Sequence, residues 1–138
     1  MKLLLHEYEL PLKHPFTISR GTITAQRTLI VELQQDGMSG YGEATANNYY
    51  DSSMDLMRTR LQAMQPLLEN ETFRDTESFW NLCAVHLADA PFVLSALDCA
   101  AHDLWGRLEN TAVHRLWGLD ANDAVKSSFT IGIAGVNE

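Results

Sequence analysis

Three side chains near residue 100 are the most conspicuous candidates for chemistry, because acidic and imidazole groups at helical spacing can share a metal ion. Asp98 and His102 are four residues apart, and Asp103 follows directly. Residues four apart lie on one face of a helix. However, the helical zinc pattern needs two histidines and a third ligand from elsewhere, and structural ion pairs often imitate such sites. We therefore expect these residues to form a solvated or capping helix surface.

The composition of the chain restricts the kinds of partner it can have. Its 138 residues are 46% hydrophobic and 20% charged, as in an ordinary soluble globular domain. The formal net charge of −8 and the scattered Lys and Arg residues argue against nucleic acid as a partner. The N-terminal apolar run ends at His6, which is too short for a signal peptide, and no segment approaches the ~20 apolar residues of a membrane helix. Cys83 and Cys99 fit a reduced, cytoplasmic protein.

The first third of the chain has strand character. Three segments alternate apolar and polar residues, at residues 2–12, 26–34 and 38–44. Asp36 and Gly37 form a tight-turn signal between the last two segments. Residues 13–24 are rich in Thr, Ser and Gly and contain Pro15, so they are predicted to form a loop. We predict a three-stranded antiparallel meander.

Helical spacing dominates the part of the chain that follows. Apolar residues recur with that spacing near residues 53–66, 75–87 and 91–108, and a short helix at 112–117 ends at Gly118. Pro66 is expected to kink or end the first helix early. A meander followed by a helical bundle gives an α+β fold. Residues 127–133 then alternate like one more strand, which either joins the meander or begins another sheet.

Several motifs occur along this series of elements in a characteristic order. They are Pro-Phe at 15–16, Gly-Tyr-Gly-Glu-Ala at 40–44, the helical segment 94–106, Leu-Trp-Gly at 116–118, and Thr130. The helical segment is similar to a Ser-Ala-(Ile/Leu)-Asp-x-Ala-x-x-Asp-Leu-x-Gly pattern. Taken together, the ordered set resembles the N-terminal part of the enolase superfamily, in its muconate-lactonizing subgroup. The resemblance covers essentially the whole chain.

The resemblance implies a division of labour between two domains. Residues 1–120 are expected to be the N-terminal capping domain. Residues 121–138 would be a linker and the first strand of a (β/α)₈ barrel that is otherwise absent. In this superfamily a Lys or His base removes a proton next to a carboxylate while Mg²⁺ stabilises the ene-diolate. The subgroup's Lys-x-Lys pair and metal carboxylates lie on later barrel strands. We therefore expect no catalytic residue and no metal ligand in this chain, and expect the barrel to bind the Mg²⁺.

The resemblance also implies a class of reaction for the complete polypeptide, namely racemisation, epimerisation or cycloisomerisation of a small carboxylate or dipeptide. The segments 15–21 and 129–131 are most similar to those of dipeptide epimerases of the L-Ala-D/L-Glu type. Muconate cycloisomerase and o-succinylbenzoate synthase remain alternatives, as does a stand-alone, non-enzymatic α+β binding module. A homo-oligomer is expected for the complete enzyme.

Four residues are the candidate substrate contacts that the resemblance indicates. Arg20, in the family's first specificity loop, has the planar donor group that suits a carboxylate, although an exposed turn arginine can simply be solvated. Tyr49 and Tyr50, in the second specificity loop, either line a side-chain pocket or pack against the cap. Thr130, on the expected barrel strand, either faces the active site or is present for strand propensity.

Overall fold

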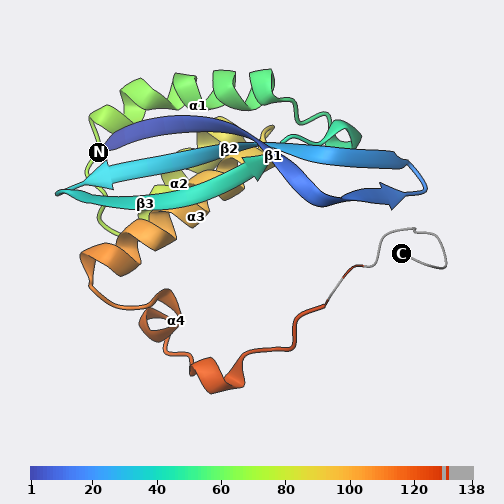
Figure 1. Ribbon diagram of the computed structural model, residues 1–138. Coiled ribbons are helices and arrows are strands. Elements are labelled where there is room, and N and C mark those ends of the chain that lie inside the picture. Colours follow the sequence, from blue (N-terminus) through green and yellow to red (C-terminus); the bar gives the residue numbers. More distant parts are fainter. Residues whose placement is uncertain (129, 131–138) are drawn as a thin grey trace.

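The computed structural model describes residues 1–128 and 130, and it shows a three-stranded antiparallel sheet followed by helices (Figure 1). The sheet order is β1–β2–β3. The predicted meander and the α+β class are therefore confirmed. The strands are β1 (Lys2–Ile18), β2 (Gly21–Gln35) and β3 (Met38–Thr45). The helices are α1 (Met54–Glu69), α2 (Thr76–Leu87), α3 (Pro91–Leu108) and α4 (Val113–Leu116), with short 3-10 turns η1 (Asn48–Tyr50) and η2 (Ala121–Asp123).

The prediction of a loop at residues 13–24 is wrong. The register of β1 against β2 shifts between Pro11 and Phe16, and the strands then continue to pair as far as a turn at Ser19 and Arg20. A ribbon with water on both faces needs no strict alternation of apolar and polar residues, so its polar composition imitated a loop.

The outer part of this hairpin is a two-stranded ribbon. β3 pairs with β2 from Thr28 to Gln35, so among the residues that the structure describes the earlier part of β2 pairs with β1 alone. In Figure 1 the ribbon projects beyond the helices. The turn at its tip is therefore held by the ribbon's own hydrogen bonds and by whatever contacts its side chains make.

The core lies between one face of the sheet and the helices. Leu29, Val31 and Leu33 on β2 are fully buried, as the alternating pattern predicts. The predicted turn between β2 and β3 is also confirmed, since Asp36 and Gly37 have φ values of 52° and 77°. The helices contribute a set of buried apolar side chains: Met57, Leu61, Leu68, Leu87, Val93, Leu97 and Leu104.

Helix α3 lies unusually close to strand β3. A Cβ atom built on Gly40 would fall 2.2 Å from the backbone nitrogen of Leu104, and one on Gly42 would fall 1.9 Å from the carbonyl oxygen of Ala96. No side chain fits at either position unless the helix moves. The two glycines of the 40–44 motif therefore set the spacing between the sheet and α3.

Two helix ends were predicted with different success. Helix α1 runs past Pro66 to Glu69, so the expected early end is wrong. Pro66 lies on the exposed side while Met64 and Leu68 are buried, and packing of these neighbours outweighs the lost backbone hydrogen bond. The end of α4 is as predicted, with Gly118 at φ 71° directly after the cap residue Trp117.

The predicted strand at 127–133 lies mostly outside the described residues, since Phe129 and residues 131–133 are among those not described. Ser127, Ser128 and Thr130 have no regular secondary structure. Across the described part of the chain, no helix combines the length and apolar character needed to cross a membrane.

Candidate functional site

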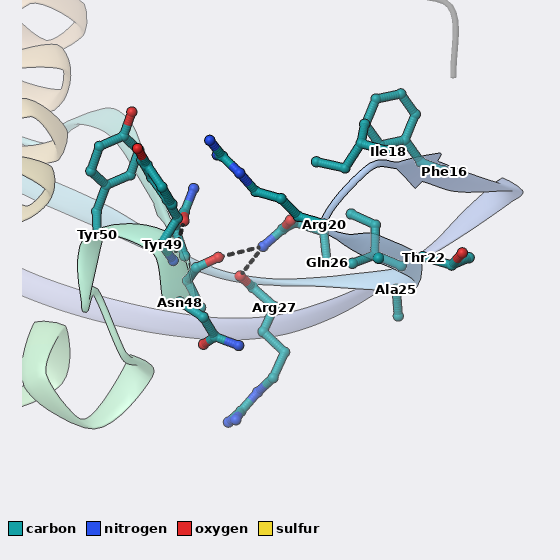
Figure 2. Close-up of a pocket in the computed structure, with 14 residues that line it drawn as sticks. Phe16, Ile18, Arg20, Thr22, Ala25, Gln26, Arg27, Asn48, Tyr49 and Tyr50 are labelled. Atoms are coloured by element: carbon teal, nitrogen blue, oxygen red, sulfur yellow. Dashed lines mark hydrogen bonds between the residues drawn. The ribbon is translucent and has the colours of Figure 1, made fainter. Parts of the chain in front are cut away.

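A cleft of about 520 Å³ lies between the tip of the β1–β2 ribbon and the connection from β3 to α1 (Figure 2). The ribbon contributes one wall and residues 46–50 contribute the other. The lining residues are Phe16, Ile18, Arg20, Gly21, Thr22, Ile23, Ala25, Gln26, Arg27, Ala46, Asn47, Asn48, Tyr49 and Tyr50. Segments predicted separately as two specificity loops therefore meet at one cavity.

The β3–α1 connection is a small closed loop. The backbone N–H groups of Asn47 and Ser52 each donate to the other residue's carbonyl oxygen, at 2.8 and 3.0 Å. The Asn47 side-chain oxygen accepts a hydrogen bond from the Tyr49 N–H at 2.9 Å, which caps η1. Asp51 then reverses the chain in the left-handed region, at φ 52°. The closure displays Tyr49 and Tyr50 at the tip of the loop, where they are 61% and 63% exposed.

Gln26 joins the two walls and was missed in the sequence analysis. Its side-chain amide donates to the carbonyl oxygens of Arg27 and Ala46, both at 3.0 Å (Figure 2). The Ala46 N–H also donates to the Arg27 carbonyl at 3.0 Å. These bonds hold the ribbon against the β3–α1 connection. The only sequence signal was a polar residue at the start of a predicted strand, which is too common to be specific.

Three of the four candidate substrate contacts come together in the cleft. The guanidinium carbon of Arg20 lies over the Tyr49 ring, 4.0 Å from its centroid. Tyr49 and Tyr50 meet edge to face, with centroids 4.7 Å apart and planes at 84°. Tyr50 in turn contacts Phe92 of α3, at 5.6 Å between centroids. Thr130 is exposed and is not among the residues that line the cleft.

The charge of the cleft differs from that of the chain. The chain carries a net charge of −8, yet among the described residues those lining the cleft include Arg20 and Arg27 and no Asp or Glu. The Arg27 side chain points away from Arg20, whose guanidinium lies beside Tyr49 (Figure 2). A cationic group over an aromatic wall favours an anionic or carboxylate-bearing ligand.

The residues near position 100 have structural partners. His102 donates through Nδ1 to the Asp98 carbonyl at 2.9 Å and lies 3.5 Å from the Asp98 carboxylate. Asp103 accepts from Arg107 at 3.1 Å and from the backbone N–H of Tyr41 at 2.9 Å. Within residues 1–128 and 130, no three His, Cys, Asp or Glu side chains are placed to hold a metal ion.

A second polar cluster, around Glu32, lies on the sheet face opposite the helices. Glu32 is only 6% exposed, and its carboxylate contacts His6 at 2.7 Å, Gln34 at 2.7 Å and the Tyr41 hydroxyl at 3.2 Å. The Ser39 hydroxyl, together with His6, Gln34 and Tyr41, lowers the pKa of Glu32 to about 2 against the opposing effect of burial. The sequence indicated only that Glu32 faces away from the core. None of these residues lines the cleft, so we interpret the cluster as a structural hydrogen-bond network.

The order of elements, a three-stranded antiparallel sheet followed by helices, can be compared with domains of known families. Residues 2–118 match the model of the mandelate racemase / muconate lactonizing enzyme N-terminal domain, and the chain belongs to this family.

Relatives of the chain are named as epimerases. An L-Ala-D/L-amino acid epimerase of Flavobacterium johnsoniae is 40% identical over the whole chain, which covers 41% of that protein. One of Maribacter sp. is 38% identical over 97% of the chain and 40% of its own length. A dipeptide epimerase structure from Methylococcus capsulatus, complexed with Mg and the dipeptide L-Arg-D-Lys, aligns with a TM-score of 0.81 at 28% identity, over 99% of this chain and 39% of that chain. The chain thus spans about two fifths of the length of these relatives.

Proposed function

We propose that this chain is the capping domain of a dipeptide epimerase, an enzyme that inverts the carbon next to a substrate carboxylate. The names of its relatives support this assignment. In this proposal residues 1–120 are the cap, and residues 121–138 are a linker and the first strand of the barrel in the complete enzyme, with Thr130 on that strand.

The observation that carries the proposal is the cleft, where Arg20 lies over Tyr49 between two loops. Arg20 binds a carboxylate of the dipeptide, and Tyr49 and Tyr50 form the wall beside the substrate side chain. A guanidinium suits this role because its planar N–H donors match the two carboxylate oxygens. The cap therefore selects and orients the substrate.

The described residues do not fit a magnesium site. Mg²⁺ prefers several converging oxygen ligands, and the described residues contain no such group of three potential ligands. Several of their carboxylates are also paired with basic side chains. Glu7 pairs with Arg58, Glu32 with His6, and Asp103 with Arg107. In the complete enzyme, Mg²⁺ and the proton-abstracting bases would therefore belong to the region that these residues do not represent.

Solvent proton exchange tests the proposal directly. The protein encoded by the complete reading frame is expressed and incubated in D₂O with Mg²⁺ and a panel of dipeptides. NMR follows the proton on the carbon next to the dipeptide carboxylate. Exchange with inversion at that carbon is the expected result. If the enzyme turns over muconate or a succinylbenzoate precursor and no dipeptide, the proposed substrate class is wrong. No exchange with any dipeptide, or a reading frame that ends at Glu138, would remove the enzymatic proposal.

A further inference from the structure

We infer that Tyr49 is a positioning residue, whose ring holds the Arg20 guanidinium at the mouth of the cleft and joins the two loops into one anion-binding unit. The part of this inference that concerns substrate rests on the proposed function. The part that concerns the position of Arg20 does not.

Arg20 needs such a partner because of where it lies. It occupies the turn of a ribbon whose outer residues pair only with each other in the described part of the chain, and an arginine side chain has many rotamers to lose. Among the described residues, Arg58, Arg60 and Arg107 each pair with a carboxylate. For Arg20, the contact within that part of the chain is the Tyr49 ring at 4.0 Å.

The Tyr49 ring is itself held from the helical layer. The Tyr49 backbone N–H is fixed by the Asn47 side chain at 2.9 Å. The edge-to-face contact with Tyr50 and the contact of Tyr50 with Phe92 link the ring to the first turn of α3. Figure 2 shows Tyr49 between Tyr50 and Arg20. The position of Arg20 is therefore set by a series of aromatic contacts that starts in the core helix.

This arrangement leaves the guanidinium able to bind a ligand. A guanidinium that rests on an aromatic face keeps its in-plane N–H donors for other groups. A carboxylate can then approach the free edge without displacing the tyrosine. The Tyr49 hydroxyl has no part in the contact, so phenylalanine is expected to replace tyrosine here, whereas leucine is not.

NMR of the 138-residue chain tests the contact without any substrate. The ring current of Tyr49 is expected to shift the Arg20 side-chain protons upfield, in wild type and in Tyr49→Phe, and the shift is lost in Tyr49→Leu. Tyr8→Leu, at an exposed tyrosine on β1, is the matched control and leaves the shift in place. If the wild type has no upfield shift, or if Tyr49→Leu retains it, the inference is overturned, whatever the enzyme does.

Kinetics of the complete enzyme test the consequence. An exposed cation–π contact corresponds to about a two- to fivefold effect. Tyr49→Leu is expected to lower the ratio of kcat/KM for acidic over neutral dipeptides by that factor, mainly through KM, and Tyr49→Phe restores it. In an Arg20→Ala background the same substitution leaves the ratio unchanged. An equal loss for both substrates, or a loss that persists without Arg20, shows that Tyr49 acts on the substrate itself and refutes the positioning role. An inactive enzyme with the NMR shift intact defeats the proposed function and leaves the Arg20–Tyr49 contact established.

Discussion

The carboxylate of Asp103 on α3 accepts a hydrogen bond of 2.9 Å from the backbone N–H of Tyr41 on β3. Within residues 1–128 and 130, β3 is an edge strand, so its outward N–H groups have no strand partner there. Asp103 also accepts from Arg107 at 3.1 Å, and the Arg107 guanidinium lies 5.7 Å from the centre of the Tyr41 ring. The Asp103 carboxylate thus connects helix α3 to strand β3 at the edge of the sheet.

Replacing Asp103 with alanine is expected to loosen that edge. The Tyr41 amide should exchange with solvent faster, and the free energy of unfolding should fall by about 0.5–1.5 kcal/mol, because the exposed N–H exchanges a charged acceptor for water. Asp103→Asn, which keeps an acceptor oxygen, should lose less. Hydrogen exchange measured by NMR and a urea titration check both effects. An unchanged Tyr41 exchange rate in Asp103→Ala would show that the bond adds nothing to the edge.

A methyl group on Gly42 is expected to be strongly destabilising. It would meet the carbonyl oxygen of Ala96 at 1.9 Å, so α3 must shift. Overpacking of this kind costs about 3 kcal/mol or more, equivalent to a fall in Tm of roughly 10 °C. Calorimetry of Gly42→Ala measures it.

Gly106→Ala is the matched control for that experiment. Its new methyl group would lie 3.0 Å from the Thr111 carbonyl oxygen, a milder contact, and alanine gains roughly 1 kcal/mol of helix propensity. Its Tm should therefore stay within a few degrees of wild type. Equal losses for the two variants would contradict the special closeness of α3 and β3.

The Glu32 cluster predicts a specific dependence of stability on pH. The pKa of Glu32 is lowered from 4.5 to about 2 in the folded chain, so the ionised carboxylate stabilises the fold above pH 4.5. That stabilisation is lost as the pH falls from 4.5 towards 2. Glu32→Gln should be less stable than wild type by ~1–3 kcal/mol at pH 7, and the difference should shrink through this window. Urea titrations at several pH values measure it.

Glu9→Gln serves as the control for the Glu32 experiment, because Glu9 is an exposed carboxylate on the same sheet. It should differ little from wild type at any pH. A Glu32→Gln difference that stays constant from pH 7 to pH 2 would mean that the charge of Glu32 contributes nothing to stability.

Arg20→Ala tests the proposed carboxylate contact in the complete enzyme. The variant should lower kcat/KM for acidic dipeptides by about ten- to a hundredfold, as expected for a lost charge-assisted bond, and should lower it far less for neutral dipeptides. The Tm should barely move, because an exposed turn side chain contributes little to folding.

Arg74→Ala is the control for the Arg20 experiment, since Arg74 is exposed in the connection between α1 and α2. It should leave the kinetics unchanged. An equal loss for acidic and neutral substrates in Arg20→Ala would mean that Arg20 only shapes the turn. No loss at all would favour Tyr49 and Tyr50 as the residues that contact substrate.

The sequence predicted the parts of the fold in which burial imposes a period. Leu29, Val31 and Leu33 alternate because one face of β2 is covered, and the Asp36-Gly37 turn needs residues that tolerate positive φ. The outer ribbon at residues 13–24 was missed because neither of its faces is buried in a core. The early end predicted for the first helix at Pro66 was wrong because the burial of neighbouring residues, which offsets the lost hydrogen bond, is known only from the packing.

The candidate site was predicted in its members and not in its arrangement. Arg20 and Tyr49 are 29 residues apart, and their contact depends on the register of β1 against β2 and on the path of the chain after β3. Neither is encoded in a local pattern. Gln26, which joins the two walls, is one polar residue among many and becomes specific only through its two carbonyl partners.

The closure between Asn47 and Ser52 has a consequence for how such a domain can diversify. The two backbone hydrogen bonds pin the loop at its base, and Ser52 is buried there while Asn48, Tyr49 and Tyr50 stand outside the core. Positions 48 and 49 can therefore change one wall of the cleft without altering a contact with the helices, whereas Tyr50 packs on Phe92 of α3 and has to be kept. Substitutions at positions 48 and 49, combined with new turns at positions 19–21, would therefore form a compact library for changing the selectivity of the cleft while the packing of the sheet and helices is kept.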